Sequence, residues 1–243
     1  MRLDVLLAER SLVDSRTDAK NFILSGAVSV NGRVIKKPSF DVSGDEDISV
    51  DTSGKKYASR GGLKLEAALD SFNINVAGTM ALDVGASSGG FTDCLLKRGA
   101  SRVIAVDSGS GQMVESLKND SRVCLFENFN ARYMTESDLE YRPDFVVMDV
   151  SFISSKHIIP AIASVIAADG GFVCLIKPQF EVGRSGLNKK GIVKNEALRR
   201  SAVQDVTSFA SACGFKLIGI IESPIIGGDG NVEYLAYFKR GYN

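Results

Sequence analysis

Two lysines and two carboxylates of this chain have the residue types needed to remove a proton from a weakly acidic hydroxyl. Lys177 and Asp149 each directly follow a strongly apolar run. An ammonium is costly to bury in apolar surroundings, and a second lysine nearby, such as Lys64, adds to that cost, so both favour the neutral amine. A general base requires this neutral form. We therefore interpret Lys177 as a candidate base, with Asp149, Lys64 and Glu233 as its partners.

Each of these residues also has an ordinary structural interpretation. Lys177 could extend to solvent from the end of a strand, and Asp149 could cap a following helix. Lys64, at the start of an expected helix over 63–72, could be a surface residue, and Glu233 could simply begin a strand. The residues at strand ends carry the stronger argument, because open parallel sheets bind ligands at the carboxyl ends of their strands.

A glycine-rich turn over residues 83–90 indicates a nucleotide-type ligand. It follows an expected strand and opens an expected helix over 91–97, and Asp107 ends the next strand about 20 residues on, where an acidic residue binds ribose hydroxyls. The glycine spacing is not that of a dinucleotide loop, and Asp83 would repel a pyrophosphate but suits an ammonium. S-adenosylmethionine carries an ammonium, a sulfonium and a ribose, so we expect this donor; the alternative is a bare strand-to-helix turn.

The residues around these positions argue against several other chemistries. Val150-Ser151 follows Asp149 where amino-group methylases usually have two prolines and an aromatic residue. Methylation of cytosine carbon needs a nucleophilic cysteine, commonly after a proline, and no cysteine here follows one. The cysteines have no metal-ligand spacing, so we expect core residues in a reducing compartment and no metal site; they are Cys94, Cys124, Cys174 and Cys213. The single histidine, His157, suits a helical position better than a catalytic triad.

The chain divides by pattern into a small N-terminal part, 1–58, and a larger part, 59–243. In the larger part strands alternate with helices, which favours an α/β fold with a parallel sheet covered on both faces. The expected strands are 80–84, 102–106, 123–126, 145–148, 171–176, 216–221 and 233–238.

The small part is expected to hold two short helices and a hairpin. Ser15 is the predicted cap of the second helix and Gly26 its left-handed end. Asn31-Gly32 predicts a type I′ hairpin turn. A further short strand over 48–50 precedes a polar linker over 51–59.

Composition limits the partners. The chain has 29 basic and 29 acidic residues, so any nucleic-acid binding must come from a local basic patch. The segment 183–191, rich in Gly, Lys and Arg, is a candidate mobile loop for phosphates. The longest apolar run, 158–168, is far shorter than the roughly 20 residues that span a bilayer. The N-terminus does not resemble a signal peptide, and we expect a cytoplasmic location.

Several ordered motifs resemble a known family. Arg2-Leu3-Asp4, Ser15-Arg16, the segment 26–32 and Lys37-Pro38 are similar to the RNA-binding module first described in ribosomal small-subunit protein S-four. The remainder resembles the FtsJ-type ribose methyltransferases. The combination, joined by the segment 59–65, resembles the TlyA proteins, historically called haemolysins.

The resemblance implies a Rossmann-like, S-adenosylmethionine-dependent methyltransferase sheet behind a small α+β RNA-binding domain. It implies a Lys-Asp-Lys-Glu tetrad on Lys64, Asp149, Lys177 and Glu233. It further implies 2′-O-methylation of cytidines in ribosomal RNA, with large-subunit (23S) RNA as the first expectation and small-subunit (16S) RNA as the second. The expected donor-binding residues are Asp83, Gly85, Ser87, Gly89, Phe91, Asp107 and Asn128, and the expected RNA-binding residues are Arg2, Arg16, Lys20, Lys36, Lys37 and Arg60.

This sequence departs from the pattern of the FtsJ-type enzymes at three places. Ala86-Ser87-Ser88 stands where many have Ala-Ala-Pro, Phe91 stands where they have Trp, and Asn128 stands where others have Asp. Three other functions remain open from the sequence: a membrane-active cytolysin, a non-catalytic RNA-binding ribosome-assembly factor, and a small-molecule O-methyltransferase.

Overall fold

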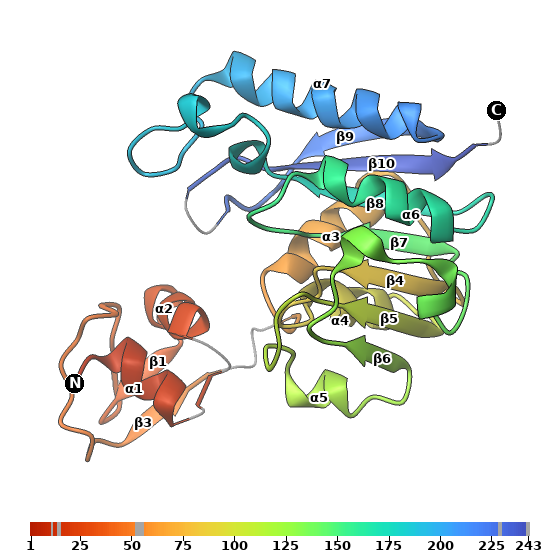
Figure 1. Cartoon of the computed structure of the whole chain (residues 1–243). Helices are drawn as coiled ribbons and strands as arrows, with labels where there is room; N and C mark the ends of the chain where they lie inside the picture. The colour runs from red at the N-terminus through yellow and green to blue at the C-terminus, as the bar shows by residue number, and fades with distance from the viewer. Residues whose placement is uncertain (11, 14–15, 52–55, 228–229, 242–243) are drawn as a thin grey trace. The chain divides into compact units, whose positions relative to one another are not determined.

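A computed structural model describes residues 1–10, 12–13, 16–51, 56–227 and 230–241 of the chain (Figure 1). The chain forms two units, Met1–Ser59 and Arg60–Asn243, each with its own internal contacts. The predicted Ser15 cap and residues 52–55 of the predicted linker lie outside the described residues.

The first unit contains two helices and a three-stranded antiparallel sheet. Helices α1 (Leu3–Glu9) and α2 (Arg16–Ser25) precede strands β1 (Val28–Val30), β2 (Arg33–Val34) and β3 (Ile48–Val50), in the sheet order β2-β1-β3. Asn31 and Gly32 both have positive φ, at 49° and 75°, as a type I′ turn requires. Gly26 has φ 81° just after α2 and ends that helix as predicted.

The second unit is built on a seven-stranded sheet in the order β6-β5-β4-β7-β8-β10-β9. Its strands are β4 (Met80–Val84), β5 (Arg102–Val106), β6 (Val123–Phe126), β7 (Phe145–Met148), β8 (Gly171–Ile176), β9 (Phe215–Glu222) and β10 (Tyr234–Arg240). Its α-helices are α3 (Gly61–Ser71), α4 (Gly90–Lys97), α5 (Glu115–Lys118), α6 (Ile159–Val165) and α7 (Glu196–Ala212), with short 3-10 turns between them. The predicted α/β class is confirmed.

Burial explains why the strands have different sequence patterns. Every residue of β7 and of β8 is buried, because helices cover both faces of the sheet there, and both strands are continuous apolar runs. In contrast, the edge strand β9 is half exposed and shows alternating burial along its length. The central strands therefore form the rigid part of the unit.

One strand departs from the predicted parallel sheet. β10 lies between β8 and β9 and runs antiparallel to both, whereas β4 to β8 pair in parallel. The described residues between β9 and β10 contain no helix, and a parallel return would have needed a longer crossover, usually a helix. β10 also begins at Tyr234, so Glu233 directly precedes the strand instead of beginning it.

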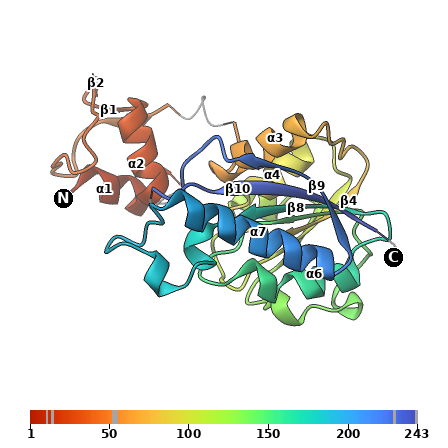
Figure 2. The same cartoon turned by 90° about the horizontal axis from the view of Figure 1, so that it is seen from above.

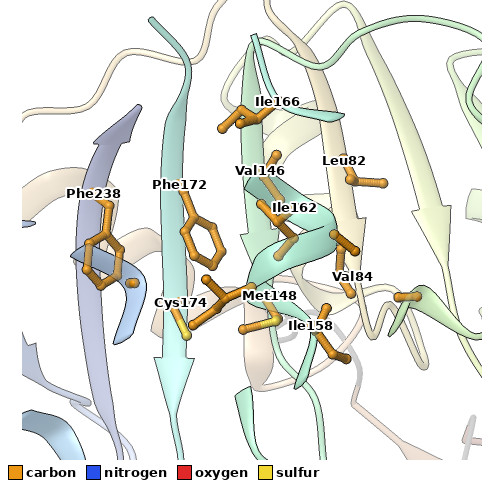
Figure 3. Packing of buried hydrophobic residues seen from close by; sticks show 14 of the residues in the cluster. Leu82, Val84, Val146, Met148, Ile158, Ile162, Ile166, Phe172, Cys174 and Phe238 are labelled. Carbon is orange, nitrogen blue, oxygen red and sulfur yellow. The ribbon is translucent and has the colours of Figure 1, made fainter. Parts of the chain in front are cut away.

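The helices cover opposite faces of the sheet, with α3 and α4 on one side and α6 and α7 on the other (Figure 2). On the α6 side, Ile158, Ile162 and Ile166 pack over strand residues that include Val146 and Phe172 (Figure 3). Fully burying such a side chain contributes about 1.5–3 kcal/mol. This core holds the strand ends of the second unit in fixed positions.

Candidate active site

Two lysine–carboxylate pairs lie in the second unit. The Nζ atom of Lys177 is 2.5 Å from Oδ1 of Asp149. The Nζ atom of Lys64 donates a hydrogen bond to Oε2 of Glu233, also at 2.5 Å. The lysine side chains are each 11% exposed, and that of Glu233 is 4% exposed. The charges are therefore largely withdrawn from water, where their mutual attraction is stronger than at an open surface.

Sheet register explains how residues far apart in sequence reach the same edge. Asp149 follows β7 and Lys177 follows β8, and these two strands are parallel neighbours. Tyr234, the first residue of β10, pairs with Ile176, the last residue of β8. Continuing this antiparallel register by one residue sets Glu233 opposite Lys177. The direction of β10 thus brings a carboxylate from its beginning to the edge where its neighbours end.

The carboxylate of Glu233 is enclosed by its own loop. The residue is 3% exposed, and a Cβ atom on Gly227 would come within 2.4 Å of its Oε1. Only glycine therefore fits against this carboxylate without displacement. Asn231, 1% exposed, closes the loop by accepting a hydrogen bond from the backbone N–H of Gly227 at its own carbonyl. Its side chain also holds a neighbouring turn.

Lys177 has a second partner, Ser151, which the sequence pattern does not indicate. Its Nζ donates to Oγ of Ser151 at 2.8 Å. Ser151 lies two residues after Asp149 in the loop that follows β7, so one loop places both a carboxylate and a hydroxyl acceptor next to the same amine. Sequence spacing gives no signal for this contact, because it joins residues from two different strand ends.

A second contact joins the loops that follow β7 and β8. The carboxylate of Glu181 accepts hydrogen bonds from Oγ of Ser154 at 2.5 Å and from the backbone N–H of Ser155 at 2.8 Å. The rings of Phe152 and Phe180, in the same two loops, have their centroids 5.3 Å apart. These contacts hold the segments that carry Asp149 and Lys177 against each other.

A cavity of about 640 Å³ opens beside these loops, at the carboxyl ends of β4, β5 and β7. This is a typical volume for a small-molecule site. Its lining includes four residues singled out from the sequence, together with Ser151; the four are Gly85, Ser87, Asp107 and Asp149. Lys177, Lys64 and Glu233 are not among its lining residues, and Lys177 is connected to the cavity through its contacts with Asp149 and Ser151.

Asp107 joins the two loops at the mouth of this cavity. Its Oδ2 accepts a hydrogen bond from the backbone N–H of Ser87 at 2.8 Å, and its Oδ1 accepts one from the N–H of Gly109 at 2.7 Å. Oγ of Ser87 donates to Oε1 of Gln112 at 2.9 Å. Each carboxylate oxygen keeps a second lone pair, which can accept a hydrogen bond from a ligand hydroxyl.

Two glycines of the turn have different neighbours. Gly85 has φ 85°, and a Cβ atom there would lie 2.3 Å from the backbone oxygen of Asp149. Gly89 has φ 92°, and a Cβ atom there would meet Cδ1 of Leu117, also at 2.3 Å. Gly85 thus lets the turn approach the end of β7 at the cavity wall. Gly89 packs against α5 and does not line the cavity.

Asp83 lies beneath the turn, and its residue is fully buried. Its Oδ2 accepts a hydrogen bond from Oγ1 of Thr92 at 2.7 Å, whereas Oδ1 has no hydrogen-bond partner. Burial raises the pKa of Asp83 to about 7; the Thr92 hydrogen bond opposes this rise and the charge of Asp149 adds to it. Asp83 does not line the cavity, so a direct contact with a donor ammonium stays a prediction.

Two other predicted donor-binding residues also lie off the cavity wall. Phe91 is 3% exposed and packs inside the unit. Asn128 is exposed with φ 55°, and the lining comes from its neighbours Phe129 and Asn130. The positive φ of Asn128 belongs to the tight turn that carries these two residues to the cavity.

The predicted RNA-binding cations have two kinds of setting in the first unit. Arg2 and Arg16 both contact the buried carboxylate of Asp4, Arg2 through two hydrogen bonds at 2.9 and 3.0 Å and Arg16 at 3.3 Å. The hydrogen bonds from Arg2 lower the pKa of Asp4 below its usual value. Both guanidinium groups remain about half exposed. The two arginines are therefore fixed in place and still open to a partner.

The other cations are free of such a carboxylate anchor in the described part of the chain. Lys20 is exposed on α2, and Arg60 is exposed at the start of α3. Lys36 and Lys37 line a hollow of about 570 Å³ together with Arg33, the first residue of β2. Asp41 and Glu46 also line this hollow, so three cations and two carboxylates meet there, a grouping that only the folded unit provides.

The remaining sequence expectations concern cysteines, metals and membranes. Among the described residues the four cysteines are free; Cys94 and Cys174 are buried, and Cys124 and Cys213 are partly buried. Within the described ranges no group of three or more His, Cys, Asp or Glu side chains is arranged to hold a metal ion. In the same ranges, no helix has the length and apolar character needed to cross a bilayer. His157 lies in a 3-10 turn, Ser155–His157.

Comparisons with known proteins give the same division of the chain into two parts. Residues 57–240 match the FtsJ-like methyltransferase family, and residues 1–48 match the S4 domain. The Mycobacterium tuberculosis protein named 16S/23S rRNA (cytidine-2′-O)-methyltransferase TlyA is 41% identical over 98% of this chain and 89% of its own length. The Campylobacter jejuni protein named 23S rRNA (cytidine-2′-O)-methyltransferase TlyA is 32% identical over 99% of this chain and all of its own length.

A solved structure also matches nearly the whole chain. A Streptococcus thermophilus protein named as a hemolysin superposes with a TM-score of 0.81 at 40% identity, covering 99% of this chain and 88% of that one. Solved methyltransferase structures at 13–17% identity share the fold over 76–79% of this chain.

Proposed function

We propose that this chain, which belongs to the FtsJ-like methyltransferase family and within it to the TlyA group, methylates the 2′-hydroxyl of a cytidine in ribosomal RNA. The observation that carries the proposal is the pairing of Lys177 with Asp149, which lines the 640 Å³ cavity, and of Lys64 with Glu233 at the same edge of the sheet. Large-subunit RNA is common to the names of both relatives, so it is the first substrate to test. Small-subunit RNA is the second.

The cavity fits S-adenosylmethionine as the donor. Asp107 has free lone pairs for ribose hydroxyls, Gly85 leaves room where a side chain would collide, and Ser87 carries a backbone N–H and a hydroxyl at the same wall. Gly89, Phe91 and Asn128 would support this wall from behind. When bound, S-adenosylmethionine supplies an activated methyl group on its sulfonium.

Lys177 is the proposed general base. A neutral amine has two N–H bonds and one lone pair. Oγ of Ser151 accepts one N–H at 2.8 Å, and Oδ1 of Asp149 lies 2.5 Å from the nitrogen, so the amine is held from two sides and its lone pair is proposed to take the proton of the ribose hydroxyl. Holding the amine in one orientation lowers the entropy cost of the proton transfer.

Lys64 and Glu233 form the proposed second half of the tetrad. Their ion pair keeps an ammonium near the edge where Lys177 lies, and a fixed positive charge stabilises the negative charge that develops on the attacking oxygen. Because Glu233 is buried and enclosed by Gly227, the position of this ammonium is tightly determined.

The S4 domain supports an RNA substrate rather than a small-molecule acceptor. We propose that it grips RNA phosphates with its exposed cations, joined by one residue at the start of the second unit; these are Arg2, Arg16, Lys20, Lys36, Lys37 and Arg60. We also propose a cytoplasmic location, where ribosomal RNA is found. A membrane-active cytolysin and a non-catalytic assembly factor are the competing functions.

The test is methyl transfer from radiolabelled S-adenosylmethionine to ribosomal RNA, with reverse-transcription mapping of the modified ribose. The wild-type protein should transfer methyl groups, and Lys177→Ala should lower turnover by about 10²–10⁴-fold while donor affinity, measured by calorimetry, stays the same. Lys216→Ala, an exposed lysine at the start of β9, is the matched control. Full transfer by Lys177→Ala, or no transfer by the wild type to either ribosomal RNA, would overturn the proposal.

A further inference from the structure

We propose that residues 188–194, the lysine turn, form an RNA-phosphate clamp that is attached to the catalytic carboxylate Glu233. The proposal rests on the proposed function and extends it to a contact surface in the second unit. Three exposed lysines of this turn carry the charge: Lys189, Lys190 and Lys194.

Charge marks this segment in a chain whose formal net charge is zero. Residues 183–200 contain six basic residues and a single acidic one, Glu196, which is paired with Arg200. Within the described residues, none of the three lysine ammonium groups has a carboxylate within salt-bridge distance. Such a local excess of unpaired positive charge is what binding to a polyanion requires.

The turn is held internally by one side chain, although the sequence analysis expected a mobile loop here. Oδ1 of Asn188 accepts hydrogen bonds from the backbone N–H groups of Lys190 at 2.8 Å and Ile192 at 2.9 Å. The N–H of Gly191 donates to the carbonyl of Asn188 at 2.9 Å. The lysines therefore project from a defined backbone.

Two anchors fix the turn to the rest of the unit. Nη1 of Arg199, on α7, donates to the carbonyls of Val193 and Lys194 at 3.0 and 3.1 Å. Arg199 is therefore a structural residue, whereas its neighbour Arg200 is exposed. The buried side chain of Asn231 accepts from the N–H of Val193 and donates to the carbonyl of Gly191, both at 3.0 Å.

The second anchor leads to the active site. Asn231 lies two residues before Glu233, and its backbone carbonyl accepts a hydrogen bond from the N–H of Gly227. Gly227 in turn packs against the carboxylate of Glu233. Glu233 in turn binds Lys64. The lysine turn and the Lys64–Glu233 pair are thus parts of one connected structure. A phosphate bound by the turn would be held at a fixed place relative to the tetrad.

The first experiment separates this surface from general electrostatics. Lys189→Gln/Lys190→Gln is compared with Lys216→Gln/Lys239→Gln, which removes two exposed lysines that face each other at the opposite edge of the sheet. Binding to a ribosomal RNA transcript is measured across a series of salt concentrations. The lysine-turn variant should bind about tenfold more weakly and lower the salt slope by about two, and the control should match the wild type.

The second experiment tests the attachment to Glu233. Asn231→Asp keeps the size of the side chain but sets an oxygen against the carbonyl of Gly191. RNA affinity should stay within about twofold of the wild type, because the lysines remain, whereas methyl-transfer turnover should fall about tenfold. Unchanged turnover would show that the lysine turn is not coupled to Glu233 through Asn231.

The outcomes distinguish a failure of the clamp proposal from a failure of the proposed methyltransferase function. If the wild type transfers no methyl group, the proposed function fails, and the RNA-binding comparison still judges the clamp. If both double variants bind RNA as tightly as the wild type does, the clamp proposal is wrong. It is equally wrong if the lysine-turn variant loses binding only to vesicles of anionic phosphatidylglycerol, because the surface would then fit a lipid.

Discussion

Lys64 and Glu233 are 169 residues apart in the chain, and their side chains meet in a hydrogen bond of 2.5 Å with little access to solvent. One lies on α3 and the other directly precedes β10, and these two elements pack against each other. The pair therefore joins helix α3 to the beginning of β10, an interior strand of the sheet, and at the same time contributes a charge to the active-site edge.

Replacing Glu233 by Gln should destabilise the second unit. The change leaves the Lys64 ammonium nearly buried without an opposing charge, which costs about 3 kcal/mol. For a unit of this size, that loss corresponds to a fall of roughly 6–12 °C in Tm in a calorimetric scan. Glu115→Gln breaks an exposed pair with Lys118 and should leave Tm unchanged. Equal Tm values for the two variants would show that the buried pair does not stabilise the fold.

Ser151→Ala should slow methyl transfer without weakening substrate binding. Loss of the 2.8 Å acceptor frees one N–H of Lys177, so the amine can turn its lone pair away from the hydroxyl. We expect kcat to fall about tenfold with KM unchanged, measured with saturating donor. Ser151→Thr keeps the acceptor and should recover most of the rate. A threonine variant as slow as the alanine variant would point to a steric role instead.

Gly85→Ala should weaken donor binding because its Cβ would collide with the backbone of Asp149 at 2.3 Å. The positive φ adds a separate cost of roughly 1 kcal/mol. Gly111→Ala is the matched control: Gly111 also has positive φ, at 69°, but nothing lies within 4 Å of its Cβ position. Calorimetry with S-adenosylmethionine should show loss of binding for the first variant only. Equal affinities would mean that the turn tolerates the collision.

Asp83 should make stability depend on pH. Its pKa is raised from 3.8 to about 7 in the folded protein, so folding favours the protonated form. The stabilising contribution is complete below about pH 4 and is lost as the pH rises through 7. Asp83→Asn stays neutral and can still accept the Thr92 hydrogen bond. It should therefore unfold less readily than the wild type at pH 8, by up to about 4 kcal/mol.

Denaturant unfolding of the wild type and Asp83→Asn from pH 5 to pH 9 measures this difference. Stability curves that run parallel would contradict the prediction. The same variant tests whether Asp83 contacts the ammonium of the donor. If it does, Asp83→Asn should bind the donor more weakly than the wild type, because the variant lacks the negative charge.

Sequence reasoning identified the residues that stand at strand ends, because apolar runs fix where strands stop. Lys177 and Asp149 follow β8 and β7 directly, as the pattern of buried residues predicts. The same rule could not assign the direction of β10, because both faces of that strand are buried and its sequence has no parallel or antiparallel signature. The usable signal is that the sequence pattern predicts no helix between the expected strands 216–221 and 233–238.

Contacts between loops were beyond the sequence. Ser151 accepts a hydrogen bond from the amine of Lys177, which follows a different strand. Asn231 accepts one from the backbone N–H of Val193, which lies in a different loop. Asp83 was expected beside the ligand because it precedes the glycine turn. In the fold its side chain turns to Thr92, since successive residues of a strand point to opposite faces.

The insertion of β10 between β8 and β9 has a consequence for synthesis of the chain. Until residues 234–240 have been made, β9 has no partner and one side of β8 is open. Unpaired strand edges of this kind attract other chains, so the nascent protein is most prone to aggregate in the interval after β9 has emerged. A chaperone that covers these two edges would protect it until the last strand closes the sheet.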